Sequence, residues 1–173
     1  MIGIRRHRQH YGQRGNTLLE TLAAVAVAGM LGVGLVALTF EMLNVNARNS
    51  NHMSAVKQVE AASRWLYRDA EMAQDVTLQG NNGFPVQLSW TDSNNQTYQA
   101  VYDLQDNNLV CSYSVNGQPP TQTVIARDID TDPLKTNCIY VNHQFTITLT
   151  ATVDAEGRPA SETRVLQIVP RSG

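Results

Sequence analysis

The chain has 173 residues, a formal net charge of −2 and two cysteines. This length suffices for one modest domain and a membrane anchor. The charge is uneven, because four arginines and no acidic residue precede Gly15, whereas the segment from Gly80 onward carries nine acidic and five basic residues. An acidic C-terminal region lacks the electrostatic footprint of nucleic-acid binding, so we expect no nucleic-acid partner.

An apolar stretch near the N-terminus organises the rest of the chain. No side chain from Thr21 to Phe40 is charged. Twenty residues at about 1.5 Å rise form a helix of roughly 30 Å, which matches the hydrocarbon core of a bilayer. The arginines upstream would hold the N-terminal end on the cytoplasmic side, so we expect a single-pass helix with the head outside.

A signal anchor or a cleaved secretory signal peptide is the ordinary interpretation of such a stretch. A secretory signal is cut at small residues after its apolar region, and Glu41-Met42-Leu43-Asn44 is a poor match to such a site. In addition, Glu20 stands at the start of the apolar run. A carboxylate is costly in lipid, so Glu20 is a candidate functional residue.

The residues around Glu20 resemble the class III signal of type IV pilins and type II secretion pseudopilins. Gly15-Asn16-Thr17-Leu18-Leu19-Glu20 follows a basic leader and precedes a long apolar helix. The resemblance implies that a prepilin peptidase cuts after Gly15, that the new N-terminus at Asn16 is methylated, and that Glu20 serves assembly. The family usually has Phe or Met after the cut, and many major pilins have a proline in the helix. This chain has Asn16 and no such proline, which suits a minor pilin or a J-type minor pseudopilin better than a major subunit.

The chemistry of these residues agrees with the resemblance. A cut before Asn16 would create an α-amino group that is largely cationic at neutral pH. In a low-dielectric layer it would pair with Glu20 of a neighbouring subunit and set the register of the filament. Ala24, Ala28 and Gly32 follow Glu20 at four-residue spacing. Such a face lets helices pack closely, although small residues are also common in membrane helices for no specific reason.

The resemblance also implies partners and a location. The partners would be other pilin or pseudopilin subunits, the prepilin peptidase, the inner-membrane assembly platform and membrane lipid. The subunit would first lie in the cytoplasmic (inner) membrane and then in an extracytoplasmic filament. That filament would be a type IV pilus (fimbrium) for adhesion or motility, a DNA-uptake pseudopilus or a type II secretion pseudopilus. The alternative is a single-pass, membrane-anchored extracytoplasmic binding or sensor domain.

The sequence predicts three regions. They are a leader over residues 1–15, a long helix over 16–79 (16–40 in the membrane or filament core, 41–79 amphipathic) and a β-rich head over 80–173. The second part of the helix is rich in helix-forming residues and carries an apolar stripe at three- and four-residue spacing. The stripe is Val56, Val59, Leu66, Ala70, Ala73 and Val76. We expect Trp65 and Tyr67 to pack under the head.

The head shows short alternating segments separated by turn signals, a pattern typical of antiparallel strands. The expected strands are Val86–Trp90, Tyr98–Leu104, Leu109–Val115, Thr123–Ala126, Phe145–Val153 and Thr163–Val169. A long helix packed on an antiparallel sheet is an α+β fold. We expect the tyrosines of these strands to cover a sheet face rather than to bind a ligand.

Cys111 and Cys138 form the only cysteine pair of the sequence. In an exported region an even pair more often indicates a disulfide than a metal site, so we expect a disulfide between them. A bridge across 27 residues would contribute roughly 3 kcal/mol. Two free, buried thiols are the alternative.

The head has few candidates for a cofactor or for catalysis. Asp128, Asp130 and Asp132 alternate as calcium ligands can, so they are a weak calcium candidate. Pro133 stands where an EF-hand needs glycine, and a solvated acidic loop is the favoured interpretation. The single head histidine, His143, makes no zinc signature. The sequence contains no nucleophile or phosphate-loop motif, so we expect no catalytic residue, no enzyme activity and no further cofactor.

Overall fold

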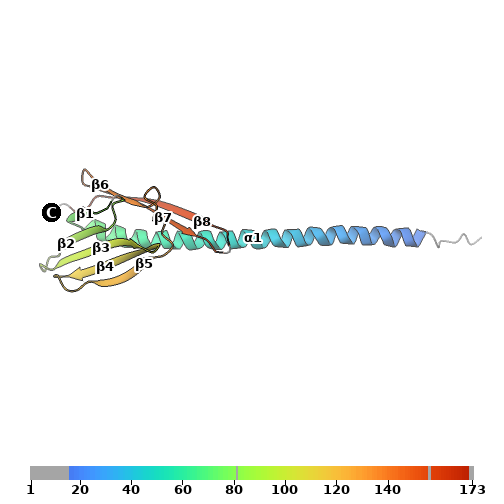
Figure 1. The fold of residues 1–173 in the computed structure, drawn as a ribbon, viewed down its shortest axis with the longest axis horizontal. Helices are drawn as coiled ribbons and strands as arrows, with labels where there is room; N and C mark the ends of the chain where they lie inside the picture. Colours follow the sequence, from blue (N-terminus) through green and yellow to red (C-terminus); the bar gives the residue numbers. More distant parts are fainter. Residues whose placement is uncertain (1–15, 81, 156, 172–173) are drawn as a thin grey trace, which may run out of the picture. The chain divides into compact units, whose positions relative to one another are not determined.

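A computed structural model of the chain describes residues 16–80, 82–155 and 157–171. In this part of the chain one helix precedes eight strands (Figure 1). The elements are α1 (Asn16–Met72), β1 (Asp75–Leu78), β2 (Val86–Thr91), β3 (Thr97–Gln105), β4 (Asn108–Val115), β5 (Thr121–Ala126), β6 (Asn137–Val141), β7 (Gln144–Val153) and β8 (Ala160–Ile168). The chain divides into two compact units, Met1–Val45 and Asn46–Gly173. The expected α+β fold, with a long helix packed on an antiparallel head, is confirmed.

Helix α1 ends at Met72, before the end expected at residue 79. Residues 75–78 form β1 instead, which pairs antiparallel with β2. The reason is local, because Asp75-Val76-Thr77-Leu78 alternates and contains two β-branched residues that favour a strand. Gln74 marks the change from helical to sheet hydrogen bonding, since its N–H donates to the carbonyl of Ser89 on β2 at 2.8 Å.

The strands form two antiparallel sheets. The larger sheet has the order β1-β2-β3-β4-β5, and the smaller has the order β6-β7-β8. The alternation seen in the sequence orients their side chains. Val86, Leu88 and Trp90 of β2 are buried while the residues between them are half-buried. Phe145, Ile147 and Leu149 of β7 are fully buried in the same way.

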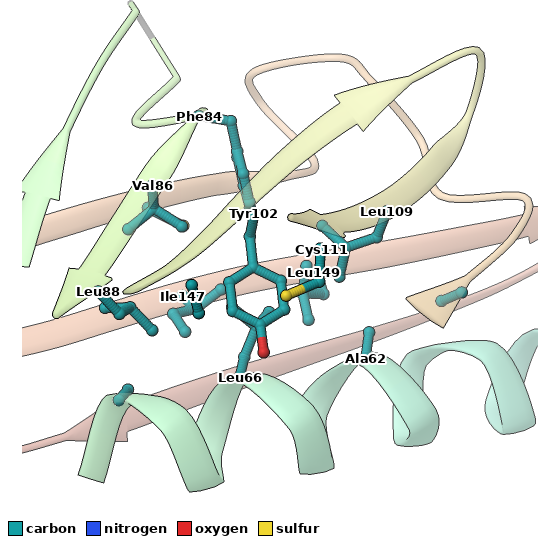
Figure 2. Packing of buried hydrophobic residues seen from close by; sticks show 14 of the residues in the cluster. Ala62, Leu66, Phe84, Val86, Leu88, Tyr102, Leu109, Cys111, Ile147 and Leu149 are labelled. Carbon is teal, nitrogen blue, oxygen red and sulfur yellow. The ribbon is translucent and has the colours of Figure 1, made fainter. Parts of the chain in front are cut away.

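One stripe of α1 and the inner faces of both sheets form a common core. The buried residues of the stripe are Ala55, Val59, Ala62, Leu66, Ala70 and Ala73, all with no exposed surface. Figure 2 shows Leu66 below the ring of Tyr102, Cys111 beside that ring and Ala62 further along the helix. Because four of the six stripe residues are alanines, the helix leaves room for large sheet residues such as Tyr102 and Phe145. The expected stripe is confirmed at Val59, Leu66, Ala70 and Ala73. It is wrong at Val56, which is half-buried, and at Val76, which is half-buried and belongs to β1. It also omits Ala55 and Ala62, which are fully buried.

The segment between β5 and β6 is pinned to β7. Ile129 forms an isolated antiparallel bridge with Ala151, and both residues are buried. Two backbone hydrogen bonds flank this bridge, from Asp130 N–H to the Thr150 carbonyl and from Thr152 N–H to the Asp128 carbonyl, each at 2.8 Å. The acidic segment is therefore irregular yet anchored, because Ile129 is part of the core.

We expect Ile129→Ala to lower the free energy of unfolding by about 2 to 4 kcal/mol, since it empties a fully buried site. The matched control is Leu134→Ala in the same segment. Leu134 is 89% exposed, so its loss should change stability by less than about 0.5 kcal/mol. Chemical denaturation of the full chain in neutral detergent, followed by tryptophan fluorescence, measures both values. Equal effects of the two variants would contradict the anchoring role.

Candidate functional site

The N-terminal part of α1 is the most unusual surface of the described chain. Every side chain from Thr17 to Val45 is exposed, and among them Leu18 is 74%, Met30 76% and Phe40 64% exposed. An 18-residue window of this helix has a mean hydropathy of 2.3 and none of it is buried. By length and composition the helix could cross a membrane. Apolar surface of this extent is unfavourable in water, so lipid or other helices must cover it.

Glu20 lies near the start of this surface and is itself exposed. The neighbouring Thr21 hydroxyl donates to the carbonyls of Thr17 and Leu18, each at 3.0 Å, so its hydrogen bond is made within the helix. Within the residues that the structure describes, no ion pair involves Glu20. A carboxylate on an apolar surface needs a cation or water, and any cation must come from outside the described part of the chain.

The face of small residues is also unoccupied by the rest of the described chain. Ala24, Ala28 and Gly32 are exposed. A Cβ atom added at Gly29, Gly32 or Gly34 would meet no other atom within 4 Å. The space beside these residues is therefore available to another helix.

Two of the predicted processing residues lie at or beyond the limit of the structure. Gly15 lies outside the described residues. Asn16 is the first residue of α1, but its side chain is not among those described. Cleavage after Gly15 and methylation of Asn16 stay predictions.

Cys111 and Cys138 are free, buried thiols, so the expected disulfide is not formed. Cys111 lies on β4 opposite Tyr102, and Cys138 lies on β6 opposite Ile147, in the other sheet. Burial raises the pKa of the Cys111 thiol to about 11 and the pKa of Cys138 well above its ordinary value. Both thiols are therefore protonated at neutral pH and act as small apolar residues of the core.

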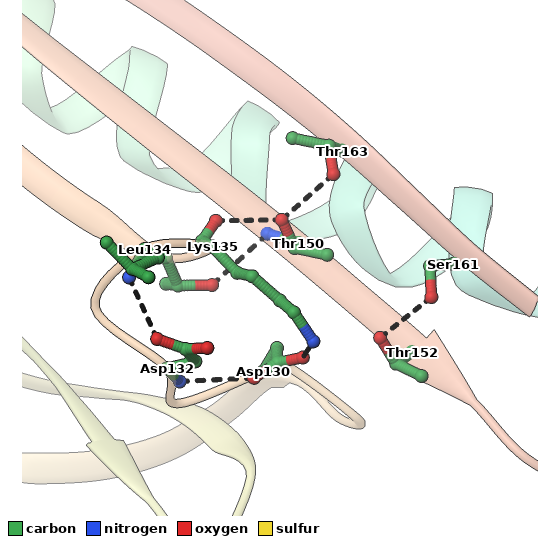
Figure 3. A network of polar contacts seen from close by, with 9 residues as sticks. Asp130, Asp132, Leu134, Lys135, Thr150, Thr152, Ser161 and Thr163 are labelled. Carbon is green, nitrogen blue, oxygen red and sulfur yellow. Dashed lines mark hydrogen bonds and ion pairs between the residues drawn. The ribbon is translucent and has the colours of Figure 1, made fainter.

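The weak calcium candidate is not formed either. Asp130 pairs with Lys135 (Oδ2 to Nζ, 2.7 Å), while one Asp132 oxygen accepts the N–H of Leu134 at 3.0 Å (Figure 3). The ion pair with Lys135 is the main cause that lowers the pKa of Asp130. In the described ranges no group of three His, Cys, Asp or Glu side chains could hold a metal ion. The carboxylates of Asp128, Asp130 and Asp132 thus do not converge, and two of them brace the segment around Ile129.

One buried charge, at Asp69, was not predicted from the sequence. Asp69 is 1% exposed, and its carboxylate accepts hydrogen bonds from the Tyr102 hydroxyl at 2.6 Å and from Arg68 Nε at 2.9 Å. These two bonds compensate for the loss of water around the carboxylate. Burial, reinforced by the charge of Asp69, raises the pKa of Tyr102. The spacing could have revealed this role, since Asp69 lies three residues after Leu66, on the buried stripe.

Two aromatic residues of α1 differ from expectation. Trp65 is 39% and Tyr67 is 45% exposed, so neither is packed fully under the head. Trp65 is nevertheless held in place, because the Arg68 guanidinium carbon lies 4.3 Å from the centre of its ring.

On the sheet, Tyr98 and Tyr113 cover the inner face as expected. Trp90 stacks on Tyr98 with ring centres 5.6 Å apart and lies 6.3 Å from Tyr113.

Comparison of the chain with protein-family models, with curated proteins and with solved structures gave no match. The function is therefore argued from the residues of this chain and from their geometry.

We expect Tyr102→Phe to lower the free energy of unfolding by about 1 to 3 kcal/mol, because it leaves the buried Asp69 carboxylate with one fewer donor. The matched control is Tyr98→Phe. The Tyr98 hydroxyl lies within hydrogen-bond distance of two acceptors, Gln96 Oε1 at 2.9 Å and Asp92 Oδ2 at 3.2 Å. Both acceptors are on residues that water can reach, so the loss of this hydroxyl should change stability by less than about 0.5 kcal/mol. Chemical denaturation of both variants tests the comparison, and a neutral Tyr102→Phe would show that Asp69 does not need this bond.

The state of the cysteines can be tested separately. A disulfide of this spacing would contribute about 3 kcal/mol, so a reducing agent would lower stability markedly if the bond were present. We expect no change in the denaturation midpoint with dithiothreitol. We also expect intact mass spectrometry after denaturation in iodoacetamide to find two alkylated thiols. If the denatured chain takes up iodoacetamide only after reduction, the two cysteines form a disulfide and the assignment of free thiols is wrong.

Proposed function

We propose that this chain is a minor pilin or pseudopilin, a structural subunit of a type IV pilus-like filament. A prepilin peptidase would cut it after Gly15, and it would assemble through its N-terminal helix. The observation that carries the proposal is the exposed, mostly apolar part of α1 over Thr17–Val45, which carries Glu20 near its start, at the end of the sequence pattern Gly15–Glu20.

The exposed apolar surface supports this function because a pilin subunit buries such a surface twice, first in lipid and then among other helices of the filament. Before assembly, lipid would cover the apolar side chains, as for any membrane helix. In a filament, the same helix would pack among the helices of other subunits, which are equally apolar. The open face at Ala24, Ala28 and Gly32 would allow close packing there.

The carboxylate of Glu20 supports filament assembly more specifically than the apolar surface does. Cleavage before Asn16 would create a cation four residues from Glu20 in sequence. Each subunit would then carry one positive and one negative group in the same apolar layer. Both charges are costly there unless they are paired, and pairing between neighbouring subunits satisfies both at one register.

The head can remain folded through this change of environment. The unit Asn46–Gly173 contains the whole described hydrophobic core, from Ala55 of α1 to Ile168 of β8. None of the exposed apolar residues before Val45 belongs to that core. Movement of the N-terminal helix from lipid to filament therefore removes no core contact of the head.

The alternative, a membrane-anchored binding or sensor domain, uses the same helix as a plain anchor. In that case Glu20 has no role, and its charge only makes insertion less favourable. The two functions therefore make opposite predictions about Glu20.

We expect Glu20→Ala to reduce incorporation into filaments by at least about tenfold, since a buried ion pair broken on one side loses several kcal/mol. The matched control is Glu41→Ala, which removes the other exposed carboxylate of this helix segment and should assemble normally. The assay is immunoblotting of sheared filaments from cells that carry the complete filament system. N-terminal mass spectrometry of the membrane fraction should find a chain that begins at Asn16 in all three proteins.

Two results would contradict the proposal. An N-terminus at Met1 or Ile2 would indicate a plain anchor, and a cut beyond Phe40 would indicate an ordinary signal peptide. Normal assembly of Glu20→Ala would remove the pairing mechanism. Protease resistance of the head in each variant separates a defect in assembly from a defect in folding.

A further inference from the structure

A groove runs along α1 beside the edge of the larger sheet. Two neighbouring cavities of about 320 Å³ and 330 Å³ share Trp65 and Arg68 as lining residues. The first lies between α1 and the strands β4 and β5, where Tyr113, Thr123 and Ile125 line it. The second continues on α1 past Ala61 and Arg64. Both cavities lie within the unit Asn46–Gly173.

Trp65 lies where the two cavities meet and is suited to anchor a ligand. It is the largest of the three aromatic side chains that α1 exposes, the others being Phe40 and Tyr67. The Arg68 guanidinium stacks on its ring, and Arg68 is in turn held by the buried Asp69. A ring that is fixed and partly exposed loses little conformational entropy on binding, which is why tryptophan is frequent at the centre of binding surfaces.

The strand that borders the groove is a free edge. β5 is the last strand of the larger sheet and pairs only with β4 among the described residues. Its sequence, TQTVIA, has no charge and no proline, and Thr121–Val124 are exposed. Natural edge strands usually carry charges or prolines that prevent further pairing, and β8, the edge of the other sheet, carries Glu162 and Arg164. The backbone of β5 is thus open to an additional strand.

The register of β5 directs such a strand into the groove. Thr121 lies opposite Tyr113, and Thr123 lies opposite Cys111. All four residues line the first cavity. Side chains alternate between the faces of a sheet, so a strand added beside β5 would place every second side chain over this cavity and toward Trp65. The β4–β5 pairing is regular from Thr121 to Val124, and its bulge falls at Ile125, at one end of the cavity.

The charge of the groove limits what the strand can be. Arg64 and Arg68 flank Trp65, and no acidic side chain lines either cavity among the described residues. Neither of the two ion pairs in the described chain involves Arg64. The rest of the head has more acidic than basic residues, so a nucleic acid would meet repulsion beyond these two arginines. Arg68 is already paired with Asp69, so Arg64 supplies the available positive charge. An extended peptide with acidic and aromatic side chains matches this charge and the cavity.

We propose that the groove between α1 and β5 binds an extended acidic peptide segment, which adds as a strand to β5 and places an aromatic side chain beside Trp65. The segment belongs to a partner protein. The proposal does not depend on filament assembly, because every residue that carries it lies in the unit Asn46–Gly173 and none lies on the exposed apolar part of α1.

The test uses the full chain in neutral detergent and a fluorescein-labelled peptide, Glu-Val-Glu-Phe-Glu-Val. We expect saturable binding by fluorescence anisotropy. Trp65→Ala and Arg64→Glu should each weaken it by about tenfold or more. The matched controls are Tyr67→Ala, an exposed aromatic of the same helix outside the groove, and Lys57→Glu, an exposed cation outside the groove. Both controls should stay within about twofold of the wild type.

Two altered peptides and one backbone measurement complete the test. The peptide with lysine in place of glutamate should not bind, and neither should one with proline at its two central positions, because proline cannot pair as a strand. Hydrogen exchange should slow at Thr121–Ala126 when the acidic peptide is bound. Absence of saturable binding, equal binding of either altered peptide, equal loss in Tyr67→Ala, or unchanged exchange in β5 would overturn the proposal. Competition by single-stranded DNA that depends on Trp65 would assign the groove to nucleic acid instead.

Discussion

The packing of one alanine-rich stripe of α1 against two sheets is the contact on which the head depends. Most side chains of the stripe are small, so the large residues of the sheets, chiefly Tyr102 and Phe145, fill the space between helix and strands. The single charged residue on this stripe, Asp69, is stabilised by hydrogen bonds from Tyr102 and Arg68. Helix and larger sheet are therefore joined by a directional bond as well as by apolar burial, and this bond fixes how the helix lies on the strands.

The same helix meets two environments along its length. After Asn51 its buried stripe alternates with exposed charges such as Lys57 and Arg64, as in a helix on the surface of a soluble head. From Thr17 to Asn44 it is exposed and mostly apolar, and Glu20 and Glu41 are its only charged residues. Such a surface is stable only against lipid or other apolar helices. By length and composition, this N-terminal part of the helix could span a membrane.

The head residues with the most evident chemistry serve its structure. The cysteines contribute protonated thiols to the core, and Asp130 and Asp132 brace the segment that inserts Ile129. Thr150 adds to this bracing, since its hydroxyl donates to the carbonyl of Lys135 at 2.7 Å and also contacts the Thr163 hydroxyl (Figure 3). The groove at Trp65 is different, because the ring of Trp65, the guanidinium of Arg64 and the edge of β5 are accessible and none of them belongs to the buried core, whereas Arg68 also hydrogen-bonds the buried Asp69.

The sequence by itself determined the α+β class, the exposed apolar helix and most strand positions, because helical spacing, strand alternation and turn residues are local properties. It also predicted most of the stripe from Val59 to Ala73. Only the tertiary structure decided where α1 ends, since β1 forms by pairing with a strand that lies later in the chain. It likewise decided that Cys111 and Cys138 lie in different sheets and stay free. It also decided that the carboxylates of Asp128, Asp130 and Asp132 do not converge. Finally, it placed Trp65 beside a groove. Each of these outcomes depends on which distant segments meet, and residue spacing along the chain does not specify that.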